Sequence, residues 1–275
     1  MLTKLTIATL IPAALLLGQP EKTAWDVLKP GLVDKNPLTR RQAVTAAGSI
    51  GLDPEAVRLV EAALKDADSL IRATAAAELG EMKSRQSFPA LKAALNDPSG
   101  EVGFASAKAL WDMGDKTARG FIEDVVAGQQ KATDDGVSGA VHKAKRTAHD
   151  PKAIASLGVK ASGALLGPFN IGVIVGEQFF ENTSVAARML ALNLLAEDCD
   201  PQTLKLLEAA SANDKNWAVR AAASKALGKC GNRDAIPKLE QNLADSNVAI
   251  RFMSAAAIIR ISVTPQATAS TSFAR

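Results

Sequence analysis

The sequence predicts an all-α protein, an α-solenoid (a superhelix) of stacked two-helix repeats, and three observations lead to this fold class. One short phrase recurs six times at a spacing of 31 or 32 residues. Alanine is abundant, and aromatic residues make up only 4% of the chain, with no tyrosine. Such a composition suits thin helical layers better than a sandwich or a barrel. Since one pair of short helices cannot bury its apolar face alone, the repeats are expected to stack into a continuous core.

Each copy of the phrase has an acidic or amide residue, an arginine six positions later, and then a run of small residues. The steps between successive arginine positions are 32 and 31 residues in a first block and again 32 and 31 in a second block. The six copies are Asp34 to Arg40, Asp66 to Arg72, Asp97 to Gly103, Asn182 to Arg188, Asp214 to Arg220 and Asp245 to Arg251. We therefore predict two blocks of repeats, at 21–127 and 182–262, separated by an insertion at 128–181.

The first helix of each unit is indicated by apolar residues four positions apart, which share one helix face and are expected to meet a neighbour. These pairs are Ala75 with Leu79, Ala191 with Leu195, and Ala223 with Leu227. Gly80 and Gly228 are predicted to end such helices in a left-handed conformation.

The second helices are expected to start near prolines, because an early helical position needs no amide donor. The prolines concerned are Pro54, Pro89, Pro201 and Pro237.

The aspartates and arginines of the phrase have a structural rationale. A carboxylate at a helix entrance accepts backbone amides, and arginine offers a planar fork of donors. On this phrase, and most clearly on VRAAASKALGKCGNRDAIPKL, the chain resembles the HEAT-repeat superfamily, in particular the short HEAT-like repeats of bilin (phycobilisome) lyases, as an exported bacterial member. The resemblance covers about residues 34–127 and 182–262, and in that family the fold serves mainly as a protein-binding surface.

The resemblance implies that the aspartates and arginines link adjacent repeats and are not catalytic. The expected ladder residues are Asp66, Arg72, Asp214, Arg220, Asp245 and Arg251. Gly103 in place of arginine and Asn182 in place of aspartate depart from the pattern, and both flank the insertion. At the insertion, the regular stacking of one repeat on the next is therefore expected to give way to a different arrangement.

Residues 1–20 have the pattern of an export signal, with one early lysine and an uncharged apolar stretch from Leu5 to Gly18. The alternative is a first buried helix of the solenoid. Residues 263–275 are rich in Ala, Ser and Thr without apolar periodicity, and we expect a disordered tail.

Cys199 and Cys230 both fall at the turn between the two helices of their units, in adjacent repeats. An even number of cysteines in an exported protein is compatible with a disulfide. Equivalent positions of stacked repeats lie near or beyond the reach of the bond, so two separate thiols remain the alternative.

The insertion has a basic part followed by an apolar, glycine-rich part. The basic part contains both histidines, His142 and His149. A solvated helix surface explains this part, and a pH-sensitive or anion-binding face is the alternative. The apolar part has 16 uncharged residues between Lys160 and Glu177, fewer than the roughly 20 needed to span a bilayer. A helical hairpin packed against the repeat blocks, peripheral membrane insertion through residues 161–176, and a ligand groove remain open. The residues of this apolar part that would form the packing or membrane hairpin and its turn are Gly163, Gly167, Pro168, Gly172 and Gly176.

The sequence shows no catalytic or metal-binding motif. It also lacks the histidine–glutamate pairs that hold iron in the HEAT-like hydroxylases of hypusine precursors. The acidic pair of Glu78 and Glu81 is interpreted as a solvated helix end. With a net charge of only +3, nucleic acid is not an expected partner.

We therefore predict a non-enzymatic scaffold or adaptor without a cofactor. It is expected to be exported to the periplasm or secreted, and to bind another protein on a helical surface. A membrane-associated scaffold and a lyase-like chaperone for a chromophore are the alternatives.

Overall fold

The structure is a computed structural model that describes residues 19–127 and 183–264. The helices of the first segment are α1 (Gln19–Leu32), α2 (Pro37–Ile50), α3 (Pro54–Ala63), α4 (Ser69–Glu81), α5 (Phe88–Ala94), α6 (Gly100–Asp112) and α7 (Arg119–Val126). Those of the second are α12 (Thr183–Leu195), α13 (Pro201–Asn213), α14 (Trp217–Cys230), α15 (Ile236–Asn242) and α16 (Val248–Val263). Short 3-10 turns at Arg85–Ser87, Lys116–Ala118 and Arg233–Ala235 precede α5, α7 and α15. No strand occurs in these two segments, so the all-α prediction is confirmed.

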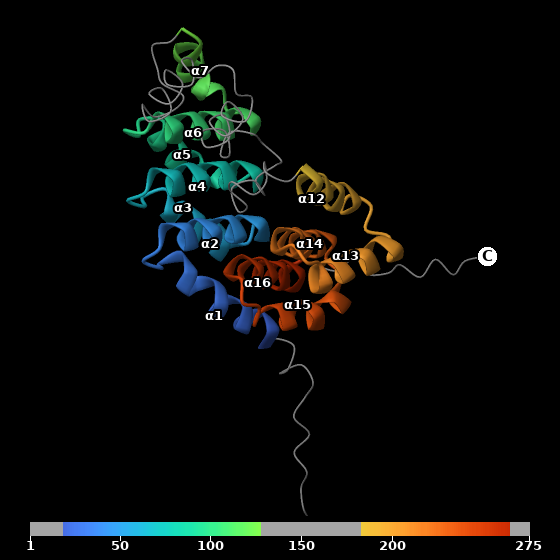
Figure 1. Cartoon of the computed structure of the whole chain (residues 1–275). Coiled ribbons are helices and arrows are strands. Elements are labelled where there is room, and N and C mark those ends of the chain that lie inside the picture. Colours follow the sequence, from blue (N-terminus) through green and yellow to red (C-terminus); the bar gives the residue numbers. More distant parts are fainter. Residues whose placement is uncertain (1–18, 128–182, 265–275) are drawn as a thin grey trace, which may run out of the picture.

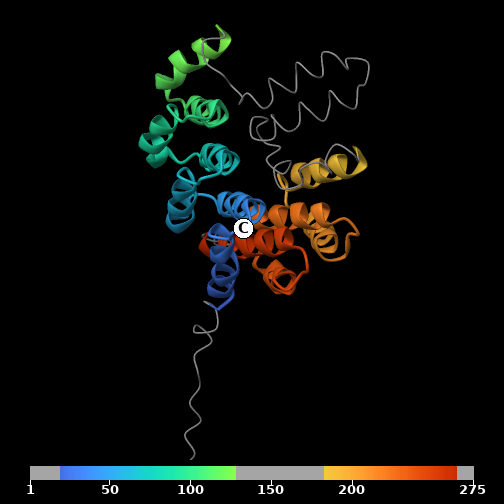
Figure 2. The same cartoon turned by 60° about the vertical axis from the view of Figure 1, so that its left-hand side comes forward.

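The helices form two parallel rows that together make a curved solenoid. The inner row runs α12, α14, α16, α2, α4, α6, and each of these helices packs against the next. The outer row runs α13, α15, α1, α3, α5, α7, on the convex side of the curve (Figures 1 and 2). The predicted solenoid of two-helix repeats is thus present, but the order of its units in space differs from their order in the sequence.

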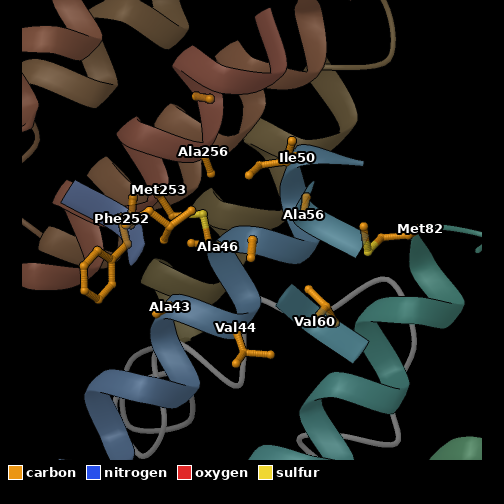
Figure 3. Packing of buried hydrophobic residues seen from close by; sticks show 14 of the residues in the cluster. Ala43, Val44, Ala46, Ile50, Ala56, Val60, Met82, Phe252, Met253 and Ala256 are labelled. Carbon is orange, nitrogen blue, oxygen red and sulfur yellow. The ribbon is translucent and has the colours of Figure 1, made fainter. Parts of the chain in front are cut away.

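The difference arises at the junction of the two blocks, where the ends of the described chain complete one unit together. Among the described residues no helix follows α16, and α1 packs against it as well as against α2. Figure 3 shows Phe252 and Met253 of α16 beside Ala46 of α2. The buried apolar residues of both segments form one continuous cluster. The row is therefore closed in its middle by residues from opposite ends of the chain.

The starts of the helices follow from local chemistry. Asp68 accepts the amide of Leu70 at 2.8 Å, and Asn216 and Asn247 accept the amides two residues beyond them in the same way. Asp200 caps α13, whose first residue is Pro201. Side-chain oxygens at these positions satisfy amides that have no partner within the helix. The prolines lie in the first turn of the outer helices, as predicted.

The prediction that Gly80 and Gly228 end their helices in a left-handed conformation is wrong. Gly80 lies inside α4 and Gly228 inside α14, and the left-handed residues come later, at Lys83 and at Gly231. The glycines are required by close packing instead. A Cβ on Gly80 would lie 2.9 Å from the Cβ of Ala109 on α6, and one on Gly228 would lie 2.8 Å from the Cα of Ala257 on α16.

The insertion connects the two ends of the row, because α7 is the last described helix before it and α12 the first after it. The units with the altered residues are therefore the terminal units. The predicted burial of first-helix residues fails in α12: Ala191 and Leu195 are exposed, whereas Ala223 and Leu227 of α14 are buried. Among the described residues no unit precedes α12 to cover them.

Several predictions concern residues outside the two described segments. They are the export signal (apart from Gln19 and Pro20, which begin α1), the whole insertion and most of the tail. Within residues 19–127 and 183–264 no helix has the length and apolar character to cross a membrane.

Candidate functional site

The aspartates and arginines of the repeated phrase pair between neighbouring units. Arg40 binds both carboxylate oxygens of Asp66 at 2.8 Å, and Arg72 binds those of Asp97 at the same distance. The partner therefore belongs to the next unit and lies 25 or 26 residues further along the chain. The six-residue spacing within a unit serves a different bond, in which Arg72 donates to the backbone carbonyl of Asp66 at 2.9 Å.

The second block repeats this arrangement. Arg188 pairs with Asp214, and Arg220 with Asp245 at 3.4 Å. Arg220 also donates to the carbonyl of Asp214, and Arg251 to the carbonyl of Asp245, each at 2.8 Å. Arg40, Arg72 and Arg220 thus each tie their own inter-unit turn to the turn of the following unit.

The electrostatics of the first block fit a structural role. The hydrogen bond from Arg40 holds the pKa of the Asp66 carboxyl below its usual value, against the opposing effect of burial. Burial opposes ionisation of Asp97 as well, but the bonds from Arg72 and from the amide of Ser99 lower its pKa. Both arginines have raised pKa values because of the same carboxylates. These carboxylates are satisfied and ionised, which leaves them no proton to exchange near neutral pH.

The structure joins Cys199 and Cys230 in a disulfide, with their Cα atoms 5.5 Å apart. Cys199 follows α12 in a left-handed conformation, and Cys230 is the last residue of α14. An ion pair between Glu197 and Lys229 lies next to the bond. The terminal unit of the described row is thereby fixed to its neighbour at two places, by the disulfide beyond the last turn of α12 and by the pair of Arg188, within α12, with Asp214.

A buried acidic residue, Glu78, lies in the stacking face of α4. The interpretation of Glu78 and Glu81 as a solvated helix end is wrong for Glu78, which is 2% exposed. Its carboxylate fits because residue 48 on the adjacent α2 is glycine: a Cβ there would lie 2.2 Å from Oε2 of Glu78. The helix end that does reach solvent is Glu81.

Burial raises the pKa of the Glu78 carboxyl to about 8. Lys225 on α14 favours the ionised form, Glu81 opposes it, and the Thr45 hydroxyl on α2 again favours it. Lys225 belongs to the second block, so the charge of Glu78 is influenced from both blocks of the solenoid. Arg41 lies on the same side of α2, and burial lowers its pKa despite the attraction of Asp68 and Glu101.

The repeat register is the signal that could have identified Glu78 from the sequence. Counting six residues on from each arginine position gives alanine in four of the other five units, at Ala46, Ala109, Ala226 and Ala257. A glutamate among alanines at a stacking position calls for an explanation that solubility does not supply. Its burial could not be deduced, because the spatial order of the units was unknown.

The terminal helix α12 presents exposed leucines at positions that other units use for stacking. Leu190 and Leu194 correspond in register to Ala222 and Ala226 of α14, which are buried. In α12 the same positions are 40% and 63% exposed. The described part of the solenoid therefore ends in a bulky apolar stripe where the neighbouring helix α14 has alanines.

The glycines of the apolar insertion, Gly163 to Gly176, and the two histidines lie outside the described residues. Within the described segments, no group of three or more His, Cys, Asp or Glu side chains is arranged to hold a metal ion.

Comparison with known proteins places the repeats in a family. A family model described as HEAT repeats matches residues 57–133 and 175–259, more than half of the chain. No curated protein matches the sequence. Among solved structures, human deoxyhypusine hydroxylase in complex with glycerol aligns with 91% of this chain and 99% of that chain, at 18% identity and a TM-score of 0.33. A similarity at this level carries no inference about activity.

Proposed function

Because the chain belongs to the HEAT repeat family, a fold generally used for protein–protein interaction, we propose that it is a non-enzymatic scaffold that binds another protein. The observation that carries this proposal is the leucine stripe of α12. Exposed apolar surface on a solenoid end is costly in water and typical of a binding surface. Leu190 and Leu194 are separated by one helical turn, so they share a face that a partner helix could contact.

The finer parts of the proposal rest on the sequence. We place the protein outside the cytoplasm because of the signal pattern of residues 1–20, and the disulfide is consistent with an oxidising compartment. The specific likeness to bilin lyases and the lyase-like chaperone have only the repeat pattern in their favour. The membrane alternative depends on residues 161–176, outside the described segments.

The test uses a photo-activated crosslinking residue in place of Leu194, in the full chain expressed in its native envelope. Leu52, in the turn between α2 and α3, is also 63% exposed and provides a matched control position. We expect a discrete protein adduct from position 194 that is absent from position 52, and its loss when Leu190 is changed to Asp. Equal labelling from both positions, or adducts to lipid alone, would refute the protein-binding proposal. Flotation of the intact protein with lipid vesicles would then support the membrane alternative.

A further inference from the structure

The unit made of α16 and α1 is the one repeat among the described units whose two helices are far apart in the sequence. Every other unit consists of helices joined by a short turn. Ala24 and Leu28 of α1 are fully buried, and both belong to the continuous core. Helix α1 therefore takes the outer position beside α16, which no other described helix occupies.

The junction of α16 with α1 and α2 also contains a close backbone approach and hydrogen bonds. Gly31 approaches the ring of Phe252 so closely that a Cβ would lie 2.3 Å from the ring Cζ. The Ser49 hydroxyl lies 3.8 Å from the sulfur of Met253, and Arg260 donates to the carbonyl of Ser49 at 2.8 Å. Helix α16 thus engages α1 and α2 together.

Helix α1 is one of four described helices that cover the inner helix α16, together with α2, α14 and α15. Residues 252–259 of α16 are all buried. Helices α2 to α7 and α12 to α15 gain most of their contacts from sequence neighbours. The α1–α16 contacts form only when residues about 220 positions apart meet, and closing such a loop has a high entropic cost.

We propose that α1 acts as a clasp: it docks on α16 as the last step of folding and joins two half-solenoids that are already formed. The chain cannot complete its fold until α16 has been made and α1 is free to move. Residues 1–18 immediately precede α1. A factor that binds these residues would therefore also keep α1 from docking on α16. An exported chain would in this way stay incompletely folded until it has crossed the membrane; this consequence, unlike the clasp itself, depends on the proposed export.

The experiment compares folding rates of the full chain and of a circular permutant that contains residues 156–275 followed directly by residues 19–155. In the permutant, Phe252 and Gly31 are separated by about 36 residues instead of about 221, and the loop-closure relation gives folding faster by roughly tenfold. The permutant keeps every described helix and breaks the chain only in the insertion. Equal or slower folding would overturn the proposal.

Pulse-labelling hydrogen exchange on the refolding natural chain tests the same claim without redesign. The amides of α1 are expected to become protected last, after those of α4, α6, α14 and α16. Protection of α1 together with the earliest helices would refute the clasp. Neither result depends on the protein partner or on the compartment.

Discussion

Arg260, near the end of α16, donates a hydrogen bond to the backbone carbonyl of Ser49, near the end of α2, at 2.8 Å. The bond joins the two blocks of the solenoid across 211 residues of sequence. It satisfies one of the carbonyls that the last turn of a helix leaves without an intrahelical partner. Burial lowers the pKa of Arg260, but arginine keeps its charge at any physiological pH.

Removing this donor should weaken the junction. We expect Arg260→Met to lower the free energy of unfolding by about 1–3 kcal/mol, since a buried acceptor loses a charged donor. Arg58→Met on the outer helix α3, whose side chain is 64% exposed, should change it by about 1 kcal/mol or less. Urea unfolding of both variants provides the comparison, and equal losses would show that the bond does not stabilise the junction.

The Arg–Asp ladder should contribute more than an ordinary surface ion pair. We expect Asp97→Asn to cost about 1–3 kcal/mol, because Arg72 keeps its position while losing a bidentate anion. Glu123→Gln removes the exposed pair with Arg119 on α7 and should cost at most about 1 kcal/mol. Thermal and urea denaturation measure both. A ladder without structural importance would give the two variants the same stability.

The two packing glycines predict an unusual response to alanine. Alanine normally stabilises a helix relative to glycine by up to about 1 kcal/mol, and Gly120→Ala on α7, with no atom within 4 Å of the added Cβ, should follow this rule. Gly80→Ala and Gly228→Ala should instead destabilise the protein, because their Cβ atoms would collide with α6 and α16. A gain of stability in either variant would contradict the close approach of the inner helices.

Glu78 should make stability depend on pH. Its carboxyl titrates near 4.5 when unfolded and near 8 in the fold, so between these values the native state binds a proton that the unfolded state releases. Stability should therefore fall as pH rises from about 4.5 to 8, by an amount on the order of a few kcal/mol. Glu78→Gln should remove most of this slope. Unfolding curves at several pH values test it, and an unchanged slope would mean that Glu78 is not the group responsible.

The disulfide should stabilise the terminal unit. A loop of 31 residues corresponds to about 3–4 kcal/mol in the chain-entropy model. Replacing Cys199 and Cys230 by serine should lower unfolding stability by up to this amount, and hydrogen exchange should quicken first in α12 and α13. Faster exchange confined to α2 and α4 would show that the bond acts elsewhere.

Much of the architecture follows from the sequence because it depends on local patterns. The repeat phrase located the units, and the prolines located the starts of the outer helices. The order of the repeat units in space could not be predicted from the sequence. Nothing in the sequence of α1 marks it as the partner of α16, since the contact depends on the curvature of the whole solenoid. The roles of Gly80 and Glu78 depend on neighbouring helices in the same way.

Closure of one curved row by helices from opposite ends of the chain brings Gly31 against Phe252, and nuclear magnetic resonance can detect this contact. We expect nuclear Overhauser contacts between the Gly31 Hα protons and the Phe252 ring, together with a Gly31 Hα shift displaced by the ring current. Gly31 Hα signals at their unperturbed positions, without contacts to Phe252 in the folded protein, would contradict it.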